Sequence, residues 1–252
     1  MDDRESRQDR FARVENHLSE IYNGDNSPAF ITLPEIWGSG FFCFDRYKNE
    51  CETLDGETFS KLAPWARKIG CYILAGSIVE CDGADLYNTS IMIGPEGEMR
   101  GYYRKIHLFG HGSEEAAVMT AGSKLCVIKT EYGNWGLSTC YDLRFPEIFR
   151  RMLDMGADSF FVTACWPATR ILHWEILNRA RALENLAWVI SCNCAGKLND
   201  HELAGSSMVV DPWGEIAARA GDKEEILTLE IDPDLPMNTR KRFPALEDRR
   251  IR

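Results

Sequence analysis

Hydrophobic positions along the chain follow two different repeat lengths. Four apolar side chains near the start recur at spacings of three and four residues: Phe11, Val14, Leu18 and Ile21. The same spacing returns over residues 59–69, 145–155 and 176–187. Apolar positions that recur with the period of an α-helix predict helices with one face against a core.

Short apolar runs lie between these helical segments and predict strands. They cover residues 29–33, 71–77, 87–93, 99–103, 134–139, 159–163 and 188–191. Turn residues at 94–98 indicate a hairpin, and those at 211–214 join residues 208–210 to 215–217 in a second one; a further turn is predicted at 24–28. Helices that alternate with buried strands predict an α/β fold with helices covering the sheets, in a single domain over residues 1–252.

Composition and charge exclude several classes of protein. Hydrophobic residues make up 44% of the chain and charged residues 27%, which is typical of a globular protein. A net charge of -10 argues against nucleic acid as a partner, and no apolar run approaches the roughly 20 residues that cross a bilayer. Nine cysteines and a charged start without a signal segment predict a reducing compartment, the cytoplasm. No cysteine pair has the spacing of a zinc site, so no metal is expected.

Cys140 has the local setting of a nucleophile. It ends the apolar run 134–139 and precedes Pro146, a residue that can begin a helix. A thiol at a junction of strand and helix lies near free backbone N–H groups, which favour a thiolate and can hold an oxyanion. The alternative is an ordinary buried cysteine.

Glu35 and Lys105 are the other candidates for chemistry. Glu35 stands where the run 29–33 ends, so its carboxylate can act as a general base, although a solvated loop glutamate has the same pattern. Lys105 lies among aromatic and aliphatic neighbours, where an ammonium suits developing negative charge. His107 is interpreted as structural, because no orienting residue is evident in the sequence.

These residues stand in motifs that resemble those of the nitrilase superfamily of carbon–nitrogen hydrolases. The matching blocks are Leu-Pro-Glu at 33–35, Tyr-Arg-Lys-Ile-His-Leu-Phe at 103–109, Cys-Tyr-Asp-Leu-Arg-Phe-Pro-Glu at 140–147, Arg-Ala-Arg-Ala-Leu-Glu-Asn at 179–185 and Ala-Gly-Ser-Ser at 204–207. The block at Cys140, with Ala-Cys-Trp-Pro at 164–167, is most similar to the omega-amidase branch. The resemblance implies a four-layer α-β-β-α sandwich, no cofactor, and a homodimer formed through helices or a higher homo-oligomer.

The resemblance also implies a role for each residue. Glu35 would deprotonate Cys140, while Lys105 and the backbone N–H of Tyr141 would hold the oxyanion. A second glutamate of the family would position Glu35 and Lys105. Glu115 fits that place best, but the adjacent Glu114 leaves the assignment open.

The substrate implied is a small linear amide with a carboxylate. Arg144 could bind that carboxylate in bidentate fashion, or form a structural ion pair with a residue such as Asp142. Arg170 is a second candidate, and Trp166 is expected to form a pocket wall.

The sequence leaves three alternatives to an omega-amidase open. A nitrilase or an N-carbamoyl amino acid amidohydrolase would use the same three reactive side chains. A catalytically silent binding protein on the same fold is the alternative from another class. The superfamily's usual first strand before the first helix is expected to be absent here, because residues 1–10 are too charged for the interior of a sheet.

Overall fold

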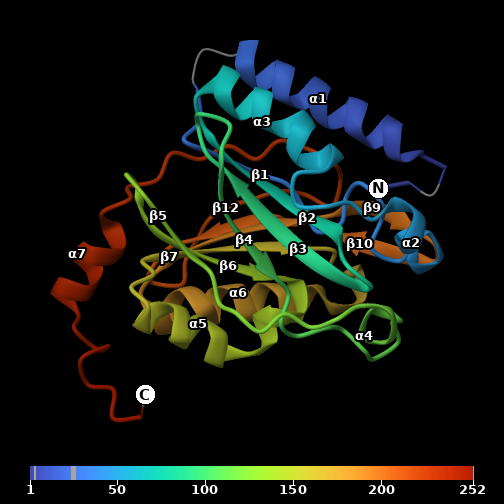
Figure 1. Ribbon diagram of the computed structural model, residues 1–252. Helices are drawn as coiled ribbons and strands as arrows, with labels where there is room; N and C mark the ends of the chain where they lie inside the picture. Colours follow the sequence, from blue (N-terminus) through green and yellow to red (C-terminus); the bar gives the residue numbers. More distant parts are fainter. Residues whose placement is uncertain (3, 24–26, 252) are drawn as a thin grey trace.

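The computed structural model describes residues 1–2, 4–23 and 27–251, and most of its strands form two sheets (Figure 1). The first sheet has the order β1-β2-β3-β4 and consists of β1 (Phe30–Thr32), β2 (Tyr72–Asp82), β3 (Asp85–Ile93) and β4 (Met99–Arg104). The second has the order β12-β11-β8-β7-β6-β5 and consists of β12 (Ile216–Arg219), β11 (Met208–Val210), β8 (Trp188–Asn193), β7 (Ser159–Ala164), β6 (Gly133–Thr139) and β5 (Val127–Thr130). Each predicted strand and both hairpins are confirmed, whereas residues 24–26 of the predicted turn lie outside the described residues.

The two sheets pack face to face, and helices cover their outer faces. Side chains between the sheets include Tyr72, Leu74, Met92 and Tyr103 from the first sheet, and Ile128, Trp135, Leu137 and Phe161 from the second. The helices α1 (Arg7–Asn23) and α3 (Glu57–Ile69) cover the first sheet, and α5 (Pro146–Asp154) and α6 (Ile171–Asn185) cover the second (Figure 1). This is the predicted α-β-β-α sandwich.

Three parallel strands at the centre of the second sheet set the position of the site. β6 pairs with β7 and β7 with β8, with Thr139 opposite Thr163 and Thr163 opposite Cys192. Because the strands run in the same direction, the residues that follow them meet at one edge of the sheet. Cys140 and Cys165 therefore leave neighbouring strands side by side.

Several short elements were not predicted from the sequence. They are η1 (Phe44–Arg46), α2 (Tyr47–Glu50), α4 (Glu115–Val118), the hairpin β9 (Ala195–Leu198) and β10 (His201–Ala204), and α7 (Leu235–Arg242). These segments are too short or too polar to show a hydrophobic period. In the described part of the chain, no helix is both long enough and apolar enough to span a bilayer.

The helix predicted over 176–187 is present as α6 (Ile171–Asn185), but two large side chains of its predicted apolar face, Ile176 and Leu183, point away from the core. Ile176 and Leu183 are 54% and 51% exposed. The buried residues of the helix are Trp174, Asn178, Arg181, Ala182 and Asn185. Polar side chains can be buried here because each finds a partner, as when Nε of Arg181 donates to the Leu143 carbonyl at 3.0 Å.

The exposed apolar face of α6 bears on the expected homodimer. Leu172 is 65% exposed and lies on the same helix as Ile176 and Leu183. Exposed apolar side chains that gather on one element are frequent at interfaces between proteins. The homodimer itself stays a prediction.

No strand precedes α1 in residues 1–2 and 4–6. Met1 lies beside β9 instead: its α-amine donates to the Ala195 carbonyl at 2.5 Å, and its carbonyl accepts the Lys197 N–H at 3.0 Å. β1 is an edge strand of the four-stranded sheet. The expectation that the superfamily's first strand is absent stays a prediction.

Candidate active site

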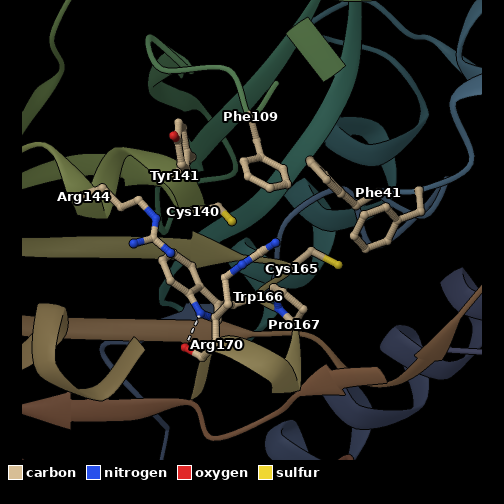
Figure 2. A pocket seen from close by; sticks show the side chains of 10 residues that line it. Phe41, Phe109, Cys140, Tyr141, Arg144, Cys165, Trp166, Pro167 and Arg170 are labelled. Carbon is tan, nitrogen blue, oxygen red and sulfur yellow. Dashed lines mark hydrogen bonds between the residues drawn. The ribbon is translucent and has the colours of Figure 1, made fainter. Parts of the chain in front are cut away.

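Cys140 lies where β6 passes into a short 3-10 helix, η2 (Cys140–Arg144). Its φ of +47° is in the left-handed region, a conformation that costs a residue with a side chain on the order of 1–3 kcal/mol. The residue is 7% exposed and lines a surface pocket (Figure 2). The strained turn thus presents the sulfur to the pocket while the preceding backbone stays in the sheet.

Glu35 follows β1 and is completely buried beside Cys140. Its backbone N–H donates to the Ala164 carbonyl at 3.3 Å, and its Oε2 accepts the Cys165 N–H at 2.8 Å. Its Oε1 accepts a hydrogen bond from Nζ of Lys105 at 2.9 Å. A carboxylate that follows a strand of the first sheet is therefore held against the end of a strand of the second.

Gly76 on β2 makes room for the segment that carries Glu35. Its φ is +69°, and a Cβ at this position would lie 2.0 Å from the Pro34 carbonyl oxygen. We expect Gly76→Ala to lower the free energy of unfolding by about 3 kcal/mol and to reduce activity, because both backbone strain and a displaced Pro34 result. Urea unfolding and kcat measure the two effects.

Gly83 is the matched control for this substitution. Its φ is +63°, but a Cβ there would meet no atom within 4 Å. Gly83→Ala should cost only the conformational strain, about 1–2 kcal/mol, and leave kcat unchanged. Equal losses of stability in the two variants would show that the close approach to Pro34 contributes nothing.

Lys105 follows β4, and its ammonium group is enclosed by two carboxylates. Nζ donates to Oε1 of Glu35 and to both carboxylate oxygens of Glu115, each at 2.9 Å. All three side chains are fully buried. Glu115 opens α4 and points into this cluster, whereas Glu114 is exposed. The structure therefore places Glu115, and not Glu114, beside Lys105.

Asn88 on β3 joins the two carboxylates and was missed in the sequence. Its Nδ2 donates to Oε1 of Glu35 and to Oε1 of Glu115, both at 2.8 Å. Two carboxylates that share one ammonium gain a further donor in this way, which allows them to lie close together. An asparagine inside an apolar strand was an available signal, because a buried amide needs polar partners.

Burial and neighbouring charges shift the proton affinities of the cluster. Burial acts to lower the pKa of Lys105, but the carboxylates of Glu115 and Glu35 outweigh it and raise that pKa above its ordinary value. Burial raises the pKa of Glu115, although Lys105 acts against it. Burial and then the charge of Glu35 raise the pKa of Cys140 well above its ordinary value. The resting thiol is therefore protonated at neutral pH, and a base must remove its proton before it can attack.

A pocket of about 330 Å³, including its mouth, leads to Cys140 (Figure 2). It is lined by Phe41, Phe42, Phe109, Cys140, Tyr141, Arg144, Cys165, Trp166, Pro167 and Arg170. Glu35, Lys105 and Glu115 are buried and are not among the residues that line it.

Arg144 and Arg170 enter this pocket from η2 and from the 3-10 turn after β7, with Trp166 beside both (Figure 2). The Arg144 guanidinium lies 4.8 Å from the Trp166 ring centroid, and the Trp166 indole N–H donates to the Arg170 carbonyl at 2.8 Å. The Arg170 guanidinium lies 5.2 Å from the Phe109 ring. Trp166 thus forms one wall of this pocket.

Arg144 does not form the ion pair with Asp142 that was the alternative interpretation. Its guanidinium lies 3.2 Å from Nδ1 of His173, while the Asp142 carboxylate binds other groups. Within the described ranges, neither Arg144 nor Arg170 has a carboxylate within ion-pair distance. Burial lowers the pKa of Arg144, and the charge of Arg170 acts in the same direction. Two guanidinium groups without carboxylate partners make this end of the pocket suited to an anion.

His107 has the orienting partner that was not evident in the sequence. Its Nδ1 lies 2.7 Å from Oδ1 of Asp142, and its ring stacks on Phe145 with 3.8 Å between centroids. It does not line the pocket. The interpretation of His107 as a structural residue therefore agrees with its position, but the reason given for it was wrong.

A buried cysteine with a glutamate and a lysine, at the edge of a two-sheet sandwich, is the arrangement expected of carbon–nitrogen hydrolases. The sequence matches the carbon-nitrogen hydrolase family over residues 4–241, and the chain belongs to that family. It is 38% identical to a 2-oxoglutaramate amidase of Paenarthrobacter nicotinovorans, over 99% of this chain and 86% of that protein. It is 33% identical to the omega-amidase NIT2 of Danio rerio, over 96% and 94% of the two chains.

A solved structure gives the same result. Nit3 of Saccharomyces cerevisiae, a member of branch 10 of the nitrilase superfamily, superposes with a TM-score of 0.89 at 30% identity, covering 98% of this chain and 92% of that one. The predicted superfamily and the resemblance to its omega-amidase branch are confirmed. The protein is a hydrolase of carbon–nitrogen bonds other than peptide bonds, and more narrowly an amidase.

Proposed function

We propose that this amidase hydrolyses small linear amides that carry a carboxylate and releases ammonia through a thioester on Cys140. The observation that carries the proposal is the pair of guanidinium groups on Arg144 and Arg170, which share one pocket with the Cys140 thiol and have no carboxylate partner in the described residues. A charged group that is partly removed from water is stabilised when a ligand of opposite charge binds to it. A substrate carboxylate supplies that charge while its amide lies over the sulfur.

Acylation begins with transfer of the Cys140 proton to Glu35. The sulfur attacks the amide carbonyl carbon, a C–S bond forms, and the carbonyl electron pair moves to the oxygen. Lys105 and the backbone N–H of Tyr141 stabilise this oxyanion, since Tyr141 lies in the first turn of η2, where amide groups lack helical partners. Glu35 then returns the proton to the nitrogen, the C–N bond breaks, and ammonia leaves a thioester on Cys140.

Deacylation uses the same groups in reverse. Glu35 takes a proton from a water molecule, whose oxygen attacks the thioester carbonyl carbon. The C–S bond breaks, and the sulfur of Cys140 recovers the proton from Glu35. The sum is amide plus water to carboxylic acid plus ammonia. Glu115 and Asn88 hold Lys105 and Glu35 in place throughout, by the contacts of 2.8–2.9 Å described above.

The names of the relatives narrow the substrate class. Relatives at 33–38% identity are a 2-oxoglutaramate amidase and an omega-amidase. A planar guanidinium binds a carboxylate with two parallel hydrogen bonds, the role we assign to Arg144. Arg170 and Trp166 complete the recognition of the same end of the substrate. Amides of 2-oxo and short dicarboxylic acids fit this arrangement, with 2-oxoglutaramate and succinamate as the sharpest candidates.

Ammonia release from a panel of compounds tests the proposal. We expect turnover of 2-oxoglutaramate and succinamate to exceed that of glutamine, an N-carbamoyl amino acid and a simple nitrile. Arg144→Ala should lower kcat/KM for 2-oxoglutaramate by about 10²–10³-fold, the equivalent of about 3–4 kcal/mol, because a bidentate charged contact is lost. Butyramide, which has no carboxylate, should be affected by less than about threefold.

Arg151→Ala is the matched control, because Arg151 is an exposed arginine on α5. It should leave kcat/KM unchanged for every compound. A preference for the carbamoyl compound or the nitrile would replace the proposed substrate class with one of the alternatives. If no member of the panel releases ammonia, the function proposed for this pocket is wrong.

We infer that the enzyme works in a reducing compartment such as the cytoplasm. Cys140 and its pocket neighbour Cys165 are both thiols in the structure. A cysteine nucleophile also has to stay reduced in order to attack an amide.

A further inference from the structure

Asp142 is a buried carboxylate that lies between the two reactive segments of the site. Its Oδ2 accepts the Tyr103 hydroxyl at 2.7 Å and the Thr139 N–H at 3.0 Å. Its Oδ1 accepts the His107 N–H at 3.1 Å and lies 2.7 Å from Nδ1 of the same histidine. Among the described residues, no lysine or arginine pairs with this carboxylate. Four hydrogen bonds therefore take the place of an ion pair.

The partners of Asp142 come from both reactive segments of the chain. Tyr103 and His107 flank Lys105 on either side, and the Tyr103 oxygen also accepts the Ile106 N–H at 3.2 Å. Thr139 directly precedes Cys140, whose left-handed backbone begins η2. One carboxylate thus fixes the backbone around the lysine and the backbone around the cysteine at once.

His107 and Tyr103, the two side chains that reach Asp142 from the lysine segment, are each held by further packing. The His107 ring stacks on Phe145 with an interplanar angle of 8°, and the Phe145 N–H donates to the Asp142 carbonyl at 2.9 Å. Tyr103 is 1% exposed. Burial, followed by the charge of Asp142, raises the pKa of Tyr103, so the phenol keeps its proton and remains a donor.

We propose that Asp142, together with Tyr103 and His107, is a positioning group that sets the distance between the Lys105 ammonium and the Cys140 sulfur. The inference rests on the proposed thiol mechanism, in which both groups must meet the same carbonyl. The group touches no substrate, because none of the three residues lines the pocket. It acts by holding the strained turn at Cys140 and the segment around Lys105 in one arrangement. Misplacement of a reacting group by about 1 Å can cost on the order of 100-fold in rate.

Asp142→Asn is the first test, since it keeps the size of the side chain and removes acceptor capacity. We expect kcat to fall by about 100-fold while KM changes by less than about threefold. The second-order rate of Cys140 alkylation by iodoacetamide should fall by about tenfold in parallel, because the same turn presents the sulfur. Circular dichroism and the melting temperature report whether the variant is folded.

Milder variants keep the proposal testable if Asp142→Asn does not fold. Tyr103→Phe removes only the hydroxyl and should lower kcat by about tenfold, whereas Tyr102→Phe, at an exposed neighbour on the same strand, should not. His107→Leu should lower kcat by a similar factor. His107→Asn should restore most of the loss, because an amide nitrogen can donate to Asp142 in place of Nδ1.

Two results would overturn the proposal. If the variants lose melting temperature but keep kcat and the alkylation rate, the group serves only stability. If KM rises while kcat stays constant, the group acts on substrate binding. Alkylation needs no substrate, so it decides this question even if 2-oxoglutaramate and succinamate are not turned over and the proposed substrate class fails.

Discussion

Cys140→Ala is expected to lower kcat for 2-oxoglutaramate by about 10⁵-fold or more, since the thioester cannot form without the sulfur. Cys165 also lines the pocket, but it follows β7 and does not lie in the first turn of η2, where the free backbone N–H groups can hold the oxyanion. Ammonia release under saturating substrate measures the loss. The melting temperature should change little, because the substitution removes a single sulfur atom at the pocket surface.

Cys126→Ala is the matched control, at a half-buried free cysteine away from the pocket lining. It should keep wild-type kcat and the fast alkylation of one thiol. In the wild type, iodoacetamide should modify Cys140 first and inactivate the enzyme with one equivalent, and substrate should protect it. If Cys140→Ala keeps turnover within tenfold of the wild type, Cys140 is not the nucleophile.

Glu35→Gln is expected to lower kcat by about 10³–10⁴-fold, because the amide cannot accept the proton of Cys140 or return it to the leaving nitrogen. The raised pKa of Cys140 makes this loss large, since the thiol does not ionise by itself at neutral pH. The variant should also show slower alkylation of Cys140. Steady-state kinetics and alkylation rates measure the two effects separately.

The substitution also changes hydrogen bonding inside the cluster. Glu35 accepts from Lys105, Asn88 and the Cys165 N–H, so an amide NH₂ group at this position meets at least one donor. Unfolding by urea should therefore accompany the kinetics. Glu114→Gln is the control, because Glu114 is exposed beside Glu115 and should tolerate the change. Activity of Glu35→Gln above a tenth of the wild-type value would assign the base to another group.

Local periodicity was sufficient to predict the regular elements of this fold. The strands β1, β2, β3, β4, β6, β7 and β8 and the main helices were all present in the sequence pattern. The same pattern failed for the direction that α6 faces. An apolar stripe normally marks the buried side of a helix, but here Asn178 and Arg181 are buried with polar partners while Ile176 is exposed. A periodic pattern records where apolar side chains lie, and it contains no information about partners on other segments.

The reactive residues could be predicted from the sequence because each of them lies in a short motif, and the set of motifs resembles that of the superfamily. Glu35, Lys105 and Cys140 follow strands that the pattern also predicted, and the structure brings them together. Arg144 was a candidate with two interpretations, and the sequence could not choose between them. The structure excluded the ion pair with Asp142, since that carboxylate is occupied by Tyr103 and His107.

What only the tertiary structure decided is the set of contacts that join distant parts of the chain. Asn88 lies 53 residues from Glu35, whose carboxylate in turn binds a backbone N–H 130 residues away, at Cys165. The sequence alone determined which side chains could do the chemistry and which elements precede them, because both follow from local composition and spacing. Three features depend on the packing of the two sheets against each other. They are the position of Glu115 rather than Glu114 beside Lys105, the hydrogen bonds by which Asn88 joins two carboxylates, and the contact between Asp142 and His107. Only that packing removes water from these groups and leaves each of them to find its partner within the protein.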